Sequence, residues 1–381
     1  MNFTIDRNVL LEKLNIVNHG LPTKTPMKVL EGIKIEVTDT DVFLTTTNSD
    51  ISIEVLVKDP SLTIQEGGKT IVPGKVFIDL IKAFDSNKIT IFLIEDRSLM
   101  IKADRKEYLI NVMDPNDYPL IDFVTLENPF VLNCKTLKDT ILETVFACSS
   151  ITKNPMLLGV NFKLQDNKLI ATATNSYRLS QKIIESTEYP DFEITIPAKS
   201  LDELLKALES YDEGQDLNIY LAKNKMLVKF NDVLFQSRLL DGNYPDTSNI
   251  IPKQTPIVVR FNKDELLTAV NRVSLLSPGD RERDREITFN AVALKIDQTH
   301  EVELSSANNQ GAGKEILIPT DIVVTEPLVI GFSSKYLIEA LRVLRSNEVE
   351  LSFINSLRQF TIRNVDNPNL TELILPFRLE N

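Results

Sequence analysis

The pattern of apolar and polar positions recurs three times along the chain. In each third a short alternating stretch ends at a polar residue (Asp6, Asn133 or Asn262), and apolar residues at helical spacing follow it. A second helical pattern comes later in each third. Together these patterns predict six helices, over residues 6–18, 74–84, 135–148, 199–209, 263–275 and 335–345.

The period of this repeat is the length of a domain. Equivalent positions lie 124 to 136 residues apart, and one third of the 381 residues is 127. A solenoid unit is much shorter, so each copy is interpreted as a whole domain. Proline and polar residues cluster near 127–129 and 253–256, where we place the boundaries. The predicted domains are residues 1–127, 128–254 and 255–381.

Alternating stretches around polar turns predict two β-hairpins in each copy. The six hairpins cover residues 33–47, 89–103, 161–174, 217–230, 292–306 and 349–362. With the shorter strands between them, each copy has about eight strands and two helices. The predicted fold class is therefore α+β: three repeated domains of antiparallel sheet, each with two helices on one face.

A stripe of charge lies on the second helix of every copy. Its positions are spaced i, i+4, i+7, which places them on one face, opposite the apolar residues. This face is either a solvated surface with pairing inside each helix or a surface with one shared role. The stripes are Lys75, Asp79 and Lys82, then Lys199, Glu203 and Lys206, then Lys335, Glu339 and Arg342.

The overall charge argues against a nucleic-acid partner until its distribution is considered. The chain carries −12 with a pI near 4.9. The six predicted helices hold 13 Lys and Arg against 11 Asp and Glu, a net of +2, so the remainder carries −14. The helices therefore form the less acidic surface.

Composition indicates a globular protein of the cytoplasm. Hydrophobic residues make up 43% and charged residues 25% of the chain. The N-terminal stretch lacks the apolar core of a secretory signal, and no apolar run approaches the ~18 residues that span a bilayer. The two cysteines, Cys134 and Cys148, are predicted on one helix as reduced, core or near-core thiols.

Residues suited to catalysis are scarce. His19 and His300 have no metal-ligand spacing and are interpreted as surface histidines in loops. Gly311-Ala312-Gly313 is followed by no phosphate-loop pattern and is interpreted as a flexible loop. No pair of carboxylates stands out. We expect no cofactor, no metal and no catalysis; an enzyme with a non-standard acid/base site is the hypothesis from another class.

Three motifs carry a resemblance to a known family. They are TNSYRLS at 174–180, FQSRLLDGNYPDTSNIIP at 235–252 and ILPFRL at 374–379. The chain resembles, from end to end, the bacterial DNA polymerase III beta subunit, the sliding clamp and processivity factor. The resemblance implies a head-to-tail homodimeric ring of six domains, with twelve helices lining a hole and antiparallel sheets outside.

Such a ring would hold double-stranded DNA by enclosure rather than by base contacts. It would tether the catalytic subunit of DNA polymerase III, and would bind the clamp loader and other proteins that carry clamp-binding peptide motifs. A peptide-binding adaptor that never encircles DNA is the alternative. No membrane partner is expected.

The resemblance also implies three sets of functional residues. The partner-peptide pocket would consist of Leu157, Thr174, Ser176, Tyr177, Arg178, Leu179, Pro245, Ile250, Tyr336, Ile374, Leu375, Pro376, Phe377 and Arg378. At the dimer interface, Tyr108 would pack against Leu275 and Leu276, next to the loop Asp280–Glu286, which departs from the family's usual length. DNA-facing residues would be Lys24, Lys153 and Asn154, with the basic stripe members Lys75, Lys82, Lys199, Lys206, Lys335 and Arg342.

An internal comparison supports the pocket independently of the family. The positions equivalent to 174–179 read TNSDIS at 47–52 and ANNQGA at 307–312, so only the second copy has the sequence Tyr-Arg-Leu. This chain has Tyr177 where many family members have histidine, and Asn249 where others often have arginine.

Overall fold

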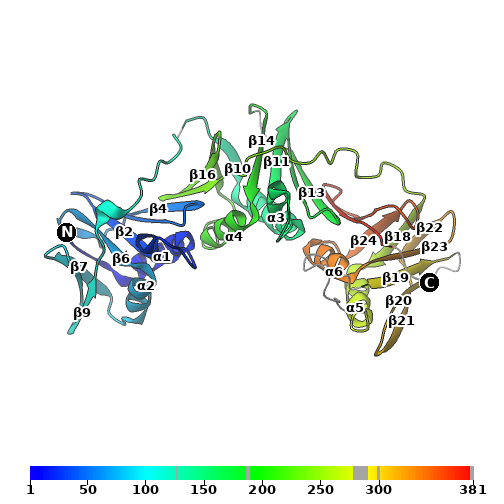
Figure 1. Ribbon diagram of the computed structural model, residues 1–381, viewed down its shortest axis with the longest axis horizontal. Helices are drawn as coiled ribbons and strands as arrows, with labels where there is room; N and C mark the ends of the chain where they lie inside the picture. The colour runs from blue at the N-terminus through cyan, green and yellow to red at the C-terminus, as the bar shows by residue number, and fades with distance from the viewer. Residues whose placement is uncertain (126, 186–188, 278–290, 298–300, 378–381) are drawn as a thin grey trace. The chain divides into compact units, whose positions relative to one another are not determined.

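The computed structural model describes residues 1–125, 127–185, 189–277, 291–297 and 301–377 (Figure 1). By its contacts the chain divides into two compact units. The first comprises Met1–Lys138 and Lys199–Leu239, and the second comprises Asp139–Ala198 and Leu240–Asn381. Each unit therefore takes part of the middle third, and the two boundaries of the three domains drawn from the repeat stay a prediction.

The first unit contains two antiparallel sheets. In the order of their neighbours, the strands of the five-stranded sheet are β5 (Thr63–Glu66), β1 (Asn2–Asp6), β7 (Lys88–Ile94), β8 (Ser98–Ala103) and β9 (Lys106–Asn111). The strands of the eight-stranded sheet are β10 (Phe130–Asn133), β15 (Asp216–Ala222), β16 (Lys225–Phe230), β17 (Val233–Arg238), β4 (Ile51–Val57), β3 (Val42–Thr47), β2 (Gly32–Val37) and β6 (Gly68–Pro73).

The second unit also contains two sheets. The strands of the nine-stranded sheet are β14 (Phe192–Pro197), β11 (Gly159–Gln165), β12 (Lys168–Thr174), β13 (Arg178–Glu185), β26 (Leu370–Ile374), β25 (Phe360–Asn364), β24 (Glu348–Phe353), β18 (Ile257–Asn262) and β22 (Asp321–Val324). The strands of the four-stranded sheet are β21 (Gly311–Leu317), β20 (Val302–Asn308), β19 (Ala291–Ile296) and β23 (Leu328–Ser333).

All six predicted hairpins form. They are β2–β3, β7–β8, β11–β12, β15–β16, β19–β20 and β24–β25, and every pair is antiparallel. Within the described residues the three thirds hold nine, eight and nine strands, close to the predicted eight. Alternation of buried and exposed side chains explains this success, because period two fixes the face that each residue presents.

The six predicted helices also form, within a few residues of their expected ends. They are α1 (Arg7–Val17), α2 (Gly74–Ala83), α3 (Cys134–Thr144), α4 (Ala198–Ala207), α5 (Lys263–Ser274) and α6 (Ser334–Val343). The polar residue before the first helix of each copy is its N-cap. The side chains of Asp6, Asn133 and Asn262 each accept two backbone N–H groups from the first turn.

The helices bury one apolar stripe each. In α1 the buried residues are Leu10, Leu14 and Val17, which recur at helical spacing. Helix α1 packs on α2 and on strands β3 and β4, and α5 packs on α6 (Figure 1). No helix in the described part of the chain is long and apolar enough to cross a membrane.

Two local predictions are wrong. Cys134 is the buried first residue of α3, but Cys148 follows the short 3-10 helix η4 (Val145–Ala147) and is not on α3. The helix ends at Thr144, whose hydroxyl donates to the carbonyl of Thr140 at 2.6 Å. Gly311–Gly313 is not a loop, because it begins strand β21 and its three residues pair with Asn308, Ala307 and Ser306 of β20.

Candidate functional site

The same asparagine turn occurs in all three copies. In each, the asparagine Oδ1 accepts the backbone N–H groups two and three residues later, at 2.8 to 3.1 Å. These groups belong to Asp50 and Ile51 for Asn48, to Tyr177 and Arg178 for Asn175, and to Gln310 and Gly311 for Asn308. Ile51, Arg178 and Gly311 are therefore structurally equivalent.

Two of these turns begin a strand that joins one copy to the next. In the first junction, β4 pairs with β17 and Ile51 lies opposite Ser237. In the second junction, β13 pairs with β26 and Arg178 lies opposite Ile374. The backbone contacts match as well, because Arg238 N donates to Asp50 O at 2.8 Å and Leu375 N donates to Tyr177 O at 2.9 Å.

Arg178 occupies a closed slot in the second junction. Its guanidinium carbon lies 5.0 Å from the centre of the Phe146 ring and 4.6 Å from that of Tyr336. Nη1 pairs with Glu339 on α6, and Nη2 donates to the backbone carbonyl of Phe146. The residue is only 9% exposed, and Glu339 balances its charge within the protein.

The rim of this slot is apolar and partly exposed. Tyr177 is 37% and Leu375 38% exposed, and Pro376 and Phe377 are half-buried. Phe377 N donates to Gly331 O at 3.0 Å, which fixes the end of the described chain against β23. Asn175 Nδ2 donates to the Tyr336 hydroxyl at 3.3 Å, which orients that ring. We call Tyr177, Leu375, Pro376 and Phe377 the apolar rim.

Two further residues of the predicted pocket, Pro245 and Leu157, belong to the 241–245 loop and to η5 (Pro155–Leu158). Gly242 has a φ of +142°, and a Cβ on it would lie 3.1 Å from the Met156 sulfur. The loop that carries the exposed Pro245 therefore lies directly on η5, which contains the buried Leu157. The backbone carbonyl of Ile250, another predicted pocket residue, accepts a hydrogen bond from Gln359 Nε2 at 2.7 Å.

Behind the rim lies a buried carboxyl group, Glu372 of β26, which is 2% exposed. The Ser180 hydroxyl lies 2.8 Å from Glu372 Oε1 and 2.6 Å from the backbone carbonyl of Glu143. The Ser180 hydroxyl is thus within hydrogen-bond distance of two acceptors, the Glu143 carbonyl and Glu372 Oε1. Burial raises the pKa of Glu372 well above its ordinary value, although the Ser180 hydrogen bond and Arg178 oppose this effect.

The first prediction concerns the ionisation of Glu372. Because burial raises its pKa, the folded protein keeps the carboxyl proton above pH 4.5, whereas the unfolded chain releases it, so stability falls as pH rises through that window. The slope approaches ~1.4 kcal/mol per pH unit. We expect Glu372→Gln, which keeps an acceptor for the Ser180 hydroxyl but carries no charge, to stabilise the protein at pH 7 and to remove this slope. Urea unfolding between pH 5 and 8 measures both effects, with exposed Glu12→Gln as the matched control; a steeper slope in Glu372→Gln contradicts the assignment.

The predicted interface residues lie at two sheet edges. Tyr108 is 46% exposed on β9, an edge strand of the described five-stranded sheet, and its ring packs edge-on against Phe84 at 5.4 Å. Leu275 is 79% exposed just after α5. Leu276 lies over β21, an edge strand of the described four-stranded sheet, where a Cβ on Gly313 would be 3.4 Å from it.

The predicted DNA-facing residues are all exposed: Lys24, Lys75, Lys82, Lys153, Asn154, Lys199, Lys206, Lys335 and Arg342. The acidic stripe members behave differently. Glu203 accepts from His19 Nδ1 at 2.8 Å and pairs with Lys206 at 2.9 Å within α4, whereas Glu339 pairs with Arg178. His19 is therefore a partly buried residue hydrogen-bonded to Glu203 rather than a surface histidine. His300 lies outside the described residues.

Family comparisons cover the chain from end to end. Models of the N-terminal, central and C-terminal domains of the DNA polymerase III beta subunit match residues 1–122, 131–246 and 248–378. The chain belongs to the DNA polymerase III beta subunit family.

Full-length relatives agree with this assignment. The beta sliding clamps of Staphylococcus epidermidis and Staphylococcus aureus are each 34% identical to this chain, over 386 and 385 residues, with 99% of both chains covered. The crystal structure of the DNA polymerase sliding clamp from Bacillus subtilis is 32% identical, with a TM-score of 0.93 and complete coverage of both chains. This chain thus has the fold and length of a beta subunit.

In this chain the structure brings most of the predicted pocket residues together. Thr174, Ser176, Arg178, Leu179, Tyr336, Ile374 and the apolar rim meet at the second junction, and Leu157 and Pro245 belong to the two segments that pack on each other at Gly242 and Met156. Leu179 and Ile374 are 2% and 1% exposed, so they form the core of the junction rather than a surface. Arg378 and the Asp280–Glu286 loop lie outside the described residues.

Sequence reasoning missed three residues of the site. Phe146 gave no signal, because a phenylalanine beyond a helix end is ordinary core material. Asn175 could have been found from its equivalents at 48 and 308. Glu339 was recognised in the charge stripe, but only the fold reveals that it pairs with Arg178 from another copy.

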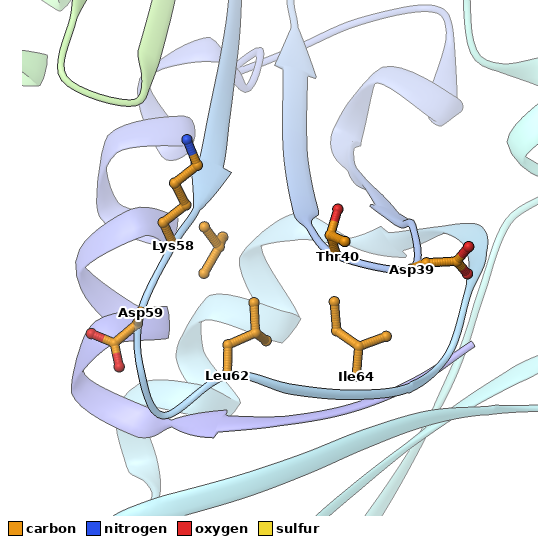
Figure 2. A pocket seen from close by; sticks show the side chains of 7 residues that line it. Asp39, Thr40, Lys58, Asp59, Leu62 and Ile64 are labelled. Carbon is orange, nitrogen blue, oxygen red and sulfur yellow. The ribbon is translucent and has the colours of Figure 1, made fainter.

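A shallow cavity of about 300 Å³ lies elsewhere, in the first unit (Figure 2). Leu62 and Ile64 point into it, while the Asp59 side chain points away. Two of its charged residues have partners, because Lys58 pairs with Asp232 at 3.6 Å and Asp59 accepts from Ser61 N at 2.8 Å. Across the described residues no three side chains are grouped so that they could hold a metal ion. We assign no role to this cavity.

Proposed function

We propose that two copies of this chain close head to tail into a sliding clamp that encircles duplex DNA. The clamp tethers the catalytic subunit of DNA polymerase III and other partners for processive synthesis. It performs no catalysis of its own, needs no cofactor and works in the cytoplasm. Family membership and the three-fold repeat of a ring-forming domain support this proposal.

One observation carries this proposal. The chain forms two junctions between copies, and the two strands that would form a third, β21 and β9, are both edge strands among the described residues. The third asparagine turn begins β21, whose far side is unpaired among the described strands. The first copy has the corresponding last strand, β9. The equivalence of β9 and β26 rests on a repeated contact, because Met113 N donates to Ile71 O at 2.8 Å just as Phe377 N donates to Gly331 O.

Transferring the register of the two junctions gives the third. Gly311 takes the position of Ile51 and Arg178, and Ile110 of a second copy takes that of Ser237 and Ile374. An antiparallel ladder then places Gly313 opposite Tyr108 of the partner subunit, beside Leu276. The next pairs are Lys314 with Glu107 and Glu315 with Lys106, which are opposite charges at directly facing positions.

The helices suit sliding on DNA. Their exposed basic residues, with Lys24, Lys153 and Asn154, would make phosphate contacts that depend on charge rather than on sequence. The charge outside the predicted helices is −14, so DNA is repelled from the rest of the surface. Weak and mobile contacts inside a closed ring allow movement without escape.

Partner peptides bind at the apolar rim of the second junction. The equivalents of Tyr177 and Leu375 in the first junction are Asp50 and Arg238, both exposed and charged. Of the two junctions within the described residues, the second therefore is the one that offers apolar anchoring positions for a peptide. The clamp loader and the polymerases would both use this surface, together with Leu157, Pro245, Ile250 and Arg378.

The second prediction tests enclosure directly. Protein that has been loaded on circular plasmid DNA should remain bound through gel filtration in high salt, because the ring cannot leave a closed circle. Cutting the plasmid with a restriction enzyme should release it, since the ring slides off the ends. Equal retention on circular and linear DNA, or a strong sequence preference, contradicts the clamp and favours an adaptor that never encircles DNA.

A further inference from the structure

We propose that Glu339 is a positioning residue of the partner-binding site, acting through Arg178, and that Arg178 itself takes no charge from the partner. This inference rests on the proposed function, because it concerns the same peptide site. It assigns a role to an acidic residue on the helical face where the sequence predicts contacts with DNA. It also restricts the partner's anchors at the apolar rim to uncharged groups.

The bonding of Arg178 leaves a partner no route to its charge. One terminal nitrogen pairs with Glu339, and the other donates to the carbonyl of Phe146. The rings of Phe146 and Tyr336 both pack against the guanidinium, with their centres 5.0 and 4.6 Å from its carbon. Arg178 Nε is buried and has no hydrogen-bond partner among the described residues. A carboxylate on a peptide therefore meets a cation that Glu339 has already neutralised.

Arg178 in turn fixes the rim around it. Its backbone carbonyl accepts the Thr174 hydroxyl at 2.5 Å, which closes the asparagine turn. The neighbouring residue Tyr177 holds Leu375 through its carbonyl, and Tyr336 stacks on the guanidinium. Removing the charge of Glu339 leaves a buried cation without its counter-charge, which strongly disfavours the closed slot. Tyr336, Tyr177 and Leu375 then lose their common support.

The repeat supplies a matched control. Glu203 stands on α4 where Glu339 stands on α6, and it accepts from His19. His19 and Phe146 are themselves equivalent, since each follows the N-cap of its copy (Asp6 and Asn133) by thirteen residues. At the first junction, however, Ile51 replaces Arg178, so no arginine slot exists there. Glu203→Gln removes the same group from the same position without touching the rim.

The test is a titration of a fluorescent Gln-x-x-Leu-x-Phe-type peptide against the intact dimer. We expect Glu339→Gln to raise the Kd about tenfold or more, Glu339→Asp to recover part of the loss, and Glu203→Gln to have no effect. Arg178→Glu should weaken binding, and the swap Arg178→Glu with Glu339→Arg should restore part of it. The slope of log Kd against log salt should be the same for wild type and Arg178→Gln.

Each result decides something different. Unchanged affinity in a folded, dimeric Glu339→Gln variant overturns the positioning role while leaving the peptide site in place. A shallower salt slope in Arg178→Gln overturns the claim that Arg178 takes no charge from the partner. Failure of the wild-type dimer to bind the peptide overturns the proposed site itself, and the positioning role with it.

Discussion

Replacing Leu275 and Leu276 together with aspartate is expected to convert the dimer into a monomer. Leu275 is 79% exposed in the single chain, so a charge there leaves the fold intact. In the ring both side chains would be buried against Tyr108 of the partner subunit. Each fully buried leucine contributes about 1.5–3 kcal/mol, and an unpaired buried carboxylate adds a further penalty. Two identical junctions per ring double the loss.

Sedimentation velocity measures this change directly, because the chain mass of 43.1 kDa must appear alone or doubled. Leu357→Asp is the control, since Leu357 is similarly exposed at 69% but lies in the β24–β25 turn, away from β9 and β21. A double variant that still sediments as a dimer refutes the assigned interface. The register makes a finer claim: Lys314→Glu should weaken the dimer, and adding Glu107→Lys should restore it.

Deleting residues 377–381 is expected to abolish peptide binding and to leave the dimer unchanged. Phe377 is half-buried in the apolar rim, and its N–H bond to Gly331 fixes the course of the chain past Leu375 and Pro376. A peptide site of this kind depends on a few buried apolar anchors, so losing one wall removes most of the affinity. The interface at β9 and β21 involves none of these residues.

The measurement is the same peptide titration, run beside sedimentation of each variant. A chain that ends at Arg378 is the comparison, because it keeps Phe377 and the predicted polar residue Arg378. We expect this shorter deletion to retain binding. Full affinity in a dimeric chain that ends at Pro376 would refute the pocket assignment and leave the ring proposal standing.

The sequence determined the elements and their order. Helices and hairpins were predictable because their signals are local: period 3.6 or 2 in apolar positions, an N-cap such as Asp6, and a polar turn. The three-fold repeat was also visible in the sequence, and it located Tyr177 and Arg178 as residues that one copy alone possesses. Where signals were weak, local reasoning failed. Gly311–Gly313 forms a strand because β20 pairs with it, and Cys148 leaves the helix because Thr144 ends it.

Only the tertiary structure decided how the copies join and what Arg178 does. Pairing between β4 and β17, or between β13 and β26, connects residues 178 to 196 positions apart, and no local pattern specifies such a partner. The closed slot depends on Phe146, Tyr336 and Glu339 arriving from separate elements, so sequence similarity placed Arg178 at the site but did not reveal its partners. Periodicity records which face of an element is buried. The same periodicity does not specify which residues pack against that face, because packing free energy depends on neighbours that are distant along the chain.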